Sequence, residues 1–194
     1  MTPFDLSTFT APLHVPELTN GSVRLRPFAV TDLPLLRTAA GDPYIPAITS
    51  VPVAYSDDSG RAFIERQHVL ALEGHGYSFV IADEADPHEG LGALGLWLPD
   101  IESGRASVGY WVVQGARGSH RARDALRTVV TFAFDELAIP RLQLFIEPWN
   151  VASQRTAEAA GFTREALLRG WERIGDAQRD AYCYALLRPE DTPD

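Results

Sequence analysis

Residues 110–122 read YWVVQGARGSHRA. An apolar run typical of a strand ends in a glycine-containing turn, and the turn leads into an amphipathic helical pattern. The first N–H groups of a helix have no partner inside the helix, and the helix dipole is positive at that end. Such a junction favours phosphate binding, and Gly118 would let the backbone approach a phosphate closely.

The charge of this junction is opposite in sign to that of the whole chain. The 194 residues carry a net charge of −9, whereas residues 114–127 contain four arginines and one aspartate. A pyrophosphate or a 3′-phosphate would explain this local positive charge. A solvated helix face that carries arginines for solubility would also explain it. Because an acidic chain does not attract nucleic acid or an anionic membrane over its whole surface, we expect neither as a partner.

On both sides of the junction the periodicity alternates between strand and helix. This order predicts an α/β (α+β) fold, in which a mixed sheet carries helices on its faces. Period-two runs predict strands at 23–28, 77–82, 91–98, 106–113, 142–147, 162–174 and 180–187. Apolar residues at steps of three and four predict helices at 31–36, from one of residues 56–58 to 74, at 118–137 and at 150–161. Two prolines in residues 44–55 favour a connecting loop there.

A second informative stretch, residues 147–153, reads EPWNVAS. Pro148 cannot donate a ladder hydrogen bond, so we expect its strand to part from a neighbour there. A slot between parting strands can hold an amide-bearing arm, and Asn150 could bond that arm or simply cap the following helix. Ser153 lies one helical turn further on. Its hydroxyl could reach a thiolate leaving group, or it could serve only in helix capping.

Composition limits the class of protein. No apolar run approaches the ~20 residues that span a bilayer, and the N-terminus lacks the pattern of a secretory signal. The single cysteine, Cys183, excludes an internal disulfide and fits a reducing cytoplasm. The histidines show no metal-ligand spacing, so we predict no metal. We expect an irregular lead-in over residues 1–20, one domain over 21–190 and a tail over 191–194.

The motifs together resemble a known family. They are Arg117-Gly118 followed by Ala122, the run Asn150-x-x-Ser153 that leads to Gly161-Phe162, the opening VRLRP at 23–27 and the closing YALL at 184–187. This pattern is similar to that of the GNAT acetyltransferase superfamily, and the RimJ/RimL branch of N-terminal protein acetyltransferases is the best match. The resemblance covers roughly residues 20–190. It implies a single GNAT-like domain whose mostly antiparallel sheet contains a splayed strand pair.

The resemblance implies an acetyl-CoA-dependent N-acetyltransferase, in which an amine attacks the thioester directly. Acetyl-CoA would lie between the splayed strands, held by the backbone of Trp111, Val112 and Val113, with Asn150 on pantetheine. The pyrophosphate would be wrapped by Arg117, Gly118, Ser119, His120, Arg121 and Ala122. Ser153 would protonate the thiolate. The acceptor would be a protein N-terminus or a small molecule such as an amino acid, a polyamine or an antibiotic, and a homodimer would be unsurprising.

Two positions depart from the family pattern. His120 stands where the phosphate loop usually carries a second glycine, and Ser107 stands where a glutamate is frequent. The general base must therefore come from elsewhere, and Glu147, on the strand face shared with Phe145, is our candidate. These departures also motivate an alternative function, namely a non-catalytic module that binds acyl-CoA or regulates another protein on the same scaffold.

Overall fold

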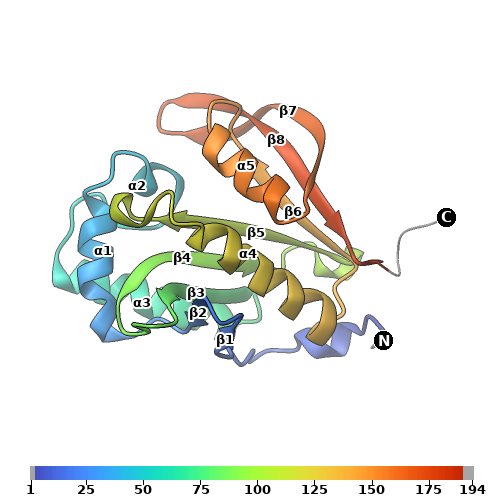
Figure 1. The fold of residues 1–194 in the computed structure, drawn as a ribbon, viewed down its shortest axis with the longest axis horizontal. Coiled ribbons are helices and arrows are strands. Elements are labelled where there is room, and N and C mark those ends of the chain that lie inside the picture. Colours follow the sequence, from blue (N-terminus) through green and yellow to red (C-terminus); the bar gives the residue numbers. More distant parts are fainter. Residues whose placement is uncertain (1–2, 190–194) are drawn as a thin grey trace.

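Eight strands form one mixed sheet in the computed structural model, which describes residues 3–189 (Figure 1). The strands are β1 (Leu18–Thr19), β2 (Val23–Arg26), β3 (Gly76–Asp83), β4 (Gly90–Trp97), β5 (Arg105–Val112), β6 (Arg141–Ile146), β7 (Thr163–Ile174) and β8 (Ala177–Leu187). Their order is β1-β2-β3-β4-β5-β6-β8-β7, and only β5 and β6 are parallel neighbours. The expected mixed, mostly antiparallel sheet is confirmed, while the tail expected at 191–194 lies outside the described residues.

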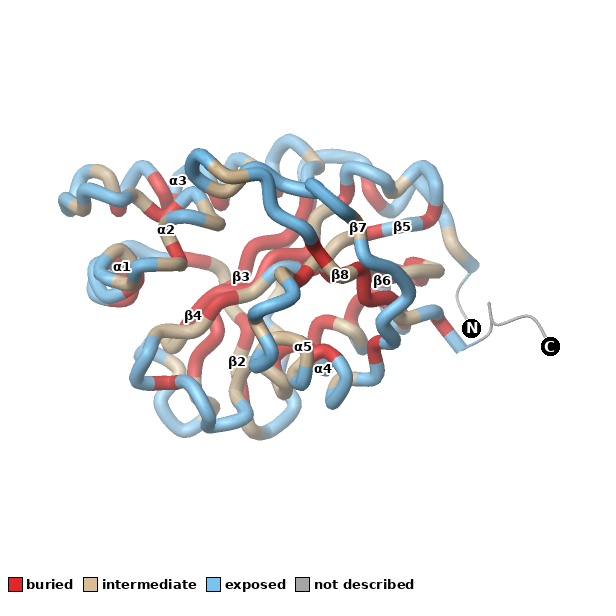
Figure 2. The backbone as a smooth tube through the Cα atoms, turned by 90° about the horizontal axis from the view of Figure 1, so that it is seen from above, coloured by how far each residue is buried: buried red, intermediate tan, exposed pale blue. Residues whose placement is uncertain are grey.

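Helices lie on both faces of this sheet (Figure 2). The α-helices are α1 (Leu33–Ala40), α2 (Ile45–Ile48), α3 (Asp57–Leu72), α4 (Arg121–Thr131) and α5 (Val151–Ala159). Four 3-10 turns are η1 (Leu6–Phe9), η2 (Val30–Asp32), η3 (Ile101–Ser103) and η4 (Gln114–Ala116), and a π-helical turn, η5 (Phe132–Glu136), extends α4. The helix predicted at 118–137 therefore corresponds to α4 and η5 together.

The hydrophobic core consists of two clusters on opposite faces of the sheet. The larger cluster packs α4, through Leu126 and Val129, against alternate residues of β2 to β6. The smaller one packs α1 and α3 against the other face, where the sheet contributes Val80, Ala93 and Trp111. The two clusters hold the ends of β4 and β5 in place, and those ends border the candidate site.

Two segments without a strong period contain more structure than their sequences suggest. Within residues 3–20, η1 and the short strand β1 are formed, and Phe9 and Leu13 are buried in the larger cluster. Within residues 44–55, which we expected to be a loop, α2 is formed. The Asp42 side chain caps it by accepting hydrogen bonds from the N–H groups of Tyr44 (2.8 Å) and Ile45 (3.1 Å).

The parallel pair β5–β6 separates soon after it begins. Its paired register covers only Arg105 to Ser107 opposite Arg141 to Gln143, whereas β5 continues to Val112 and β6 to Ile146. Figure 1 shows the two strands close together at one end and apart toward α5. Beyond Ser107 the backbone groups of β5 on this side have no strand partner. The splayed pair that we expected is therefore present, but the strands part after Gln143 and not at Pro148, which lies beyond the end of β6.

Candidate active site

Two cavities meet in the gap between β5 and β6. The cleft, of about 920 Å³, lies among the β5–α4 loop, α4 and α5. The chamber, of about 290 Å³, lies over β4, β5 and β6 next to α3. Six residues line both cavities, and they are Tyr44, Ile48, Tyr110, Trp111, Asn150 and Ser153. A molecule that extends from the cleft into the chamber must therefore pass these six side chains.

The loop before α4 has the backbone geometry of an anion site. Gly118 has φ +77 and His120 has φ +63, so two left-handed residues alternate with ordinary ones, as in a backbone nest. Within the described part of the chain, the N–H groups of Gly118, Ser119 and His120 have no recorded hydrogen-bond acceptor. These unbonded donors lie at the positive end of α4, so the loop fits a phosphate group.

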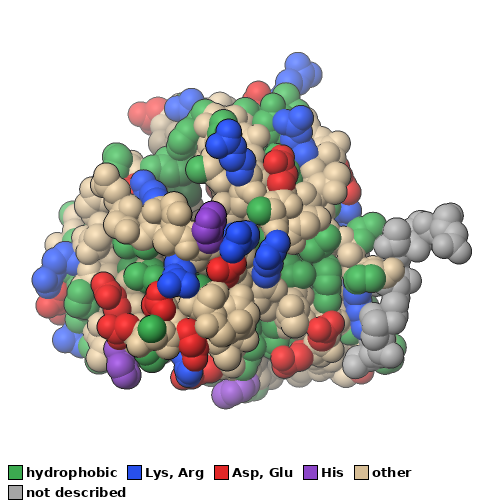
Figure 3. Space-filling model, viewed as in Figure 1, with side chains coloured by type: hydrophobic (Ala, Val, Ile, Leu, Met, Phe, Trp, Pro, Cys, Tyr) green, Lys and Arg blue, Asp and Glu red, His purple; other side chains and the backbone are tan. Residues whose placement is uncertain are grey.

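The arginines of this loop are engaged with carboxylates from distant segments. Arg117 pairs with Asp42 (Nη2–Oδ2, 2.6 Å), and Arg121 pairs with Asp83 at the end of β3. Figure 3 accordingly shows arginine and acidic side chains intermingled on this face. The positive charge that residues 114–127 carry in the sequence is thus partly neutralised by carboxylates that the tertiary fold brings close. A phosphate in the cleft has to compete with these carboxylates for the arginines.

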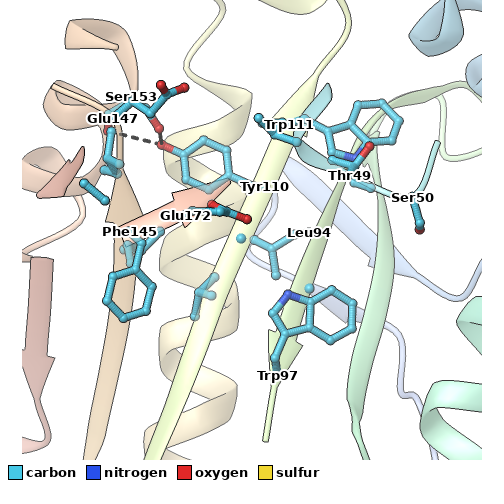
Figure 4. A pocket seen from close by; sticks show the side chains of 18 of the residues that line it. Thr49, Ser50, Leu94, Trp97, Tyr110, Trp111, Phe145, Glu147, Ser153 and Glu172 are labelled. Atoms are coloured by element: carbon cyan, nitrogen blue, oxygen red, sulfur yellow. Dashed lines mark hydrogen bonds between the residues drawn. The ribbon is translucent and has the colours of Figure 1, made fainter. Parts of the chain in front are cut away.

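Asn150 and Ser153 lie where α5 begins, at the junction of the two cavities. Asn150 accepts a hydrogen bond from the Ser153 N–H (3.1 Å), so its capping role is confirmed. Its Nδ2 hydrogens find no acceptor among residues 3–189 and remain available to a ligand amide. The Ser153 hydroxyl contacts the Tyr110 phenol (Oγ–Oη, 2.8 Å), as Figure 4 shows.

Tyr110 is a site residue that the sequence analysis missed. It projects from β5 into the gap, where its phenol contacts Ser153. Burial raises the pKa of Tyr110, and the hydrogen bonds with Ser153 and Thr156 offset part of that rise. The phenol therefore stays protonated at neutral pH and can donate a proton. The alternation of β5 places Tyr110 and Trp111 on opposite faces, and only the separation of β6 makes Tyr110 accessible.

Two glutamates line the chamber. Glu147 accepts a hydrogen bond from the Tyr44 hydroxyl, and its side chain is only 9% exposed. Its Oε1 atom lies 3.9 Å from Arg179 Nε. Burial, and then this hydrogen bond, raise the pKa of Tyr44. Glu172, on β7, points into the chamber (Figure 4), and no hydrogen bond or ion pair is recorded for it within the described chain. Its position depends on β7 folding back beside β8, which no local motif signals.

Most residues expected to hold the cofactor come together in the cleft. They are Trp111, Val112, Arg117, Gly118, His120, Arg121, Ala122 and Asn150. Two others do not line it. The N–H of Val113 donates to Leu91 O (3.0 Å), and the Ser119 hydroxyl donates to Ala116 O (2.6 Å) inside the loop. Ser153 lines both cavities, and Glu147 lines the chamber.

Among residues 3–189, no helix is both long enough and apolar enough to cross a membrane. The same residues contain no group of three or more His, Cys, Asp or Glu side chains placed to hold a metal ion.

Comparison with known proteins identifies relatives with the same architecture. Residues 22–163 match the family model described as the acetyltransferase (GNAT) domain. The chain is 28% identical over 167 residues to the N-acetyltransferase p20 of Bacillus licheniformis, covering 86% of this chain and 93% of that protein.

Solved structures share the fold at lower identity. RimJ of Mycobacterium smegmatis, in complex with CoA-disulfide, aligns with a TM-score of 0.78 at 24% identity, covering 94% of this chain and 90% of that one. The ribosomal L7/L12 α-N-protein acetyltransferase RimL, in complex with coenzyme A, aligns with a TM-score of 0.74 at 18% identity, covering 89% of this chain and 98% of that one.

Proposed function

This chain belongs to the GNAT acetyltransferase domain family, and from this premise we propose how its site transfers an acetyl group to an amine. It is an acetyl-CoA-dependent N-acetyltransferase. The observation that carries the proposed site is the contact between Tyr110 and Ser153, which lies where the cleft and the chamber meet. We assign the cleft to the CoA moiety and the chamber to the acceptor amine.

Acetyl-CoA supplies an activated thioester, and the residues of this chain bind it and move protons. The unbonded N–H groups at 118–120 and the N-terminus of α4 would hold the pyrophosphate, and the Asn150 amide would bond the pantetheine arm. The amine nitrogen bonds to the acetyl carbon as the carbon–sulfur bond breaks. Ser153 then protonates the departing sulfur and recovers a proton from the Tyr110 phenol. The newly bonded nitrogen gives up its second proton, which restores the phenol, so the products are the neutral amide and the free thiol.

A protonated amine must first lose a proton, and the chamber offers two carboxylates for this step. Glu147, the candidate from the sequence, is already engaged by Tyr44 and lies near Arg179. Glu172 has no such partner in the described chain and points into the same space (Figure 4). We therefore assign proton acceptance to Glu172, and to Glu147 the positioning of Tyr44.

The proposed acceptor is a primary amine, including the α-amine of a protein N-terminus. The acidic lining of the chamber complements an ammonium group, and the RimL neighbour, which is named a ribosomal L7/L12 α-N-protein acetyltransferase, supports a protein N-terminus as acceptor. A panel that contains both peptides and small amines separates a protein N-terminal acetyltransferase from a small-molecule one.

The experiment begins with titration calorimetry of acetyl-CoA beside ATP and NAD, followed by turnover on that panel. We expect binding of acetyl-CoA alone and formation of N-acetyl product.

Ser153→Ala and Tyr110→Phe should each lower kcat by about 10²-fold or more while acetyl-CoA still binds. Glu172→Gln should shift the pH–rate profile, whereas Glu147→Gln should mainly raise the KM for the amine. Binding of acetyl-CoA without turnover of any amine would instead favour the non-catalytic module.

A further inference from the structure

The chamber extends well beyond the reacting groups. Figure 4 shows Ser153, Glu147 and Tyr110 at one end and the Trp97 indole at the other, with Glu172 between them. The far end lies between the sheet and α3, which contributes Phe63, Gln67 and Leu70. An amine held near Tyr110 would therefore direct the rest of its molecule along β4 and β5 toward Trp97.

A pair of glycines shapes this far end. Gly95 of β4 and Gly109 of β5 are directly opposite each other in the register. A Cβ at position 95 would overlap the Trp97 indole, which lies over Gly95, whereas a Cβ at position 109 would lie 3.6 Å from Trp97 Nε1. The missing side chain at Gly95 therefore makes room for the indole, and the missing side chain at Gly109 leaves a recess on the sheet beside that indole.

The recess has an apolar and aromatic character. Within residues 3–189, Trp97 joins no ring pair, and its Nε1 has no recorded hydrogen-bond partner. The two polar side chains nearby satisfy each other, since the Ser78 hydroxyl donates to Gln67 Oε1 (2.9 Å) and Gln67 Nε2 donates to Phe63 O (3.3 Å). Apart from the indole N–H, a polar ligand group would find few partners at this end of the chamber, and its desolvation would be poorly compensated.

We propose that the acceptor is a primary amine that carries an aromatic group, and that this group lies against Trp97 in the recess over Gly109. This inference rests on the proposed function, because it assumes that the amine reacts beside Tyr110 and Ser153. The chamber, of about 290 Å³, holds one group of side-chain size. Glu172 complements the ammonium group of such an acceptor, and the unpaired indole of Trp97 complements its aromatic group.

Two sources offer this chemistry, namely a free arylalkylamine and a polypeptide whose first residue is aromatic. Both place one flat apolar group close to a primary amine. Acceptors that are polar along their whole length, such as polyamines and aminated sugars, lack that group and would leave the recess unfilled. The panel therefore needs matched pairs from each source.

The test compares kcat/KM for 2-phenylethylamine and ethylamine, and for two peptides that differ only in a first Phe or Gly. In the native enzyme, we expect the aromatic member of at least one pair to be favoured by about tenfold or more. Gly109→Ala adds one methyl group inside the recess at an ordinary contact distance and should reduce this preference by at least about fivefold. Trp97→Ala should reduce it as well. Gly41→Ala, a matched change outside both cavities, should leave it unchanged.

Equal kcat/KM for the members of both pairs in the native enzyme, or a preference that survives in both Gly109→Ala and Trp97→Ala, overturns the inference. Neither result affects the proposed function, because turnover of the small amines would continue. Calorimetric binding of 2-phenylethylamine to the CoA-loaded protein gives a second readout, and Gly109→Ala should weaken it. The pair with the higher native kcat/KM identifies the source as a free amine or an N-terminus.

Discussion

At the scale of single residues, His120 adopts a backbone conformation that favours glycine. Its φ of +63 lies in the left-handed region, which costs an L-residue roughly 1–2 kcal/mol. The residue also precedes α4 without donating or accepting a side-chain cap. The imidazole therefore occupies the phosphate loop at an energetic cost, and the family's usual glycine at this position has a direct conformational explanation.

The substitution His120→Gly should stabilise the protein by about 0.5–1 kcal/mol, because relief of the strain exceeds the extra chain entropy of glycine. Urea unfolding at pH 7 measures this change in the free energy of unfolding. His120→Ala is the control, since alanine keeps the strain and should give no gain. If the two variants are equally stable, the left-handed backbone is not the source of strain.

At the scale of elements, the connection from β2 to α1 depends on one buried ion pair. Arg26 donates to both carboxylate oxygens of Asp32, from Nη1 to Oδ2 (2.8 Å) and from Nη2 to Oδ1 (2.7 Å). Asp32 also accepts a hydrogen bond from the N–H of Ala29 (2.8 Å). The Asp32 side chain is 1% exposed. Removal of the carboxylate would leave a largely buried guanidinium without its ion-pair partner, although Arg26 Nε still donates to Pro87 O (2.8 Å). Breaking a buried ion pair in this way is among the most costly changes to a fold.

Asp32→Ala should therefore destabilise the protein by about 3–5 kcal/mol, measured by urea unfolding. The double change Arg26→Met with Asp32→Leu should recover much of this loss, because it removes both charges together. A single variant that loses less than about 1 kcal/mol would show that water reaches Arg26 and replaces the carboxylate.

A second ion pair joins the segment that begins α2 to the phosphate loop. Asp42, whose side chain is 8% exposed, caps α2 and binds Arg117. Burial would raise the pKa of Asp42, but the N–H groups of Tyr44 and Ile45, together with Arg117, lower it overall. The carboxylate is therefore ionised at neutral pH and opposes an incoming phosphate.

Asp42→Asn should strengthen acetyl-CoA binding about 3–10-fold at low salt, because asparagine keeps the cap while Arg117 is released. The gain should shrink at high salt, where charges are screened. Titration calorimetry at two ionic strengths makes the measurement. Weaker binding in Asp42→Asn would mean that Asp42 holds Arg117 in the orientation that the phosphate requires.

These elements also show which parts of the structure could be predicted. The strand–turn–helix junction and the Asn150 cap depend on neighbours in sequence, so local pattern identifies them. The separation of β6 from β5 begins after Gln143, well before Pro148, so that proline does not mark it. Asp42, Asp83 and Glu172 reach the site only through the tertiary fold, and no nearby motif marks them. For the same reason, the local excess of arginine overstated the positive charge of the loop.

At the scale of the whole molecule, the 17 residues counted as lysine or arginine are all arginine, so the chain contains no lysine. The enzyme consequently has no lysine side chain of its own to acetylate. Intact-mass measurements during turnover can therefore report acetyl transfer to an acceptor without this background. The net charge of −9 also keeps its sign over the neutral and alkaline range, since every group that loses a proton there makes the chain more negative.

Alkaline stability of the molecule should depend on its buried tyrosines. Burial raises the pKa of Tyr77 from an ordinary 10.0 to about 12, and the ring is enclosed by Phe79 and Phe132. Below pH 10 the phenol is neutral in both folded and unfolded chains, so stability is unaffected. Between pH 10 and 12 the unfolded chain releases this proton while the folded chain keeps it, and stability falls by up to about 1.4 kcal/mol per pH unit per tyrosine.

The comparison is between urea unfolding of the native protein and of Tyr77→Phe from pH 8.5 to 11.5. The variant should match the native protein at pH 8.5, because no hydrogen bond is recorded for the Tyr77 hydroxyl within residues 3–189. Above pH 10 the free energy of unfolding of the variant should fall less steeply with pH, and the difference between the two slopes should correspond to the release of one proton. Burial also raises the pKa of Tyr110. Tyr110→Phe therefore provides an independent test of the expected loss of stability as the pH rises. An unchanged slope in both variants would show that these phenols ionise equally in the folded and unfolded chains.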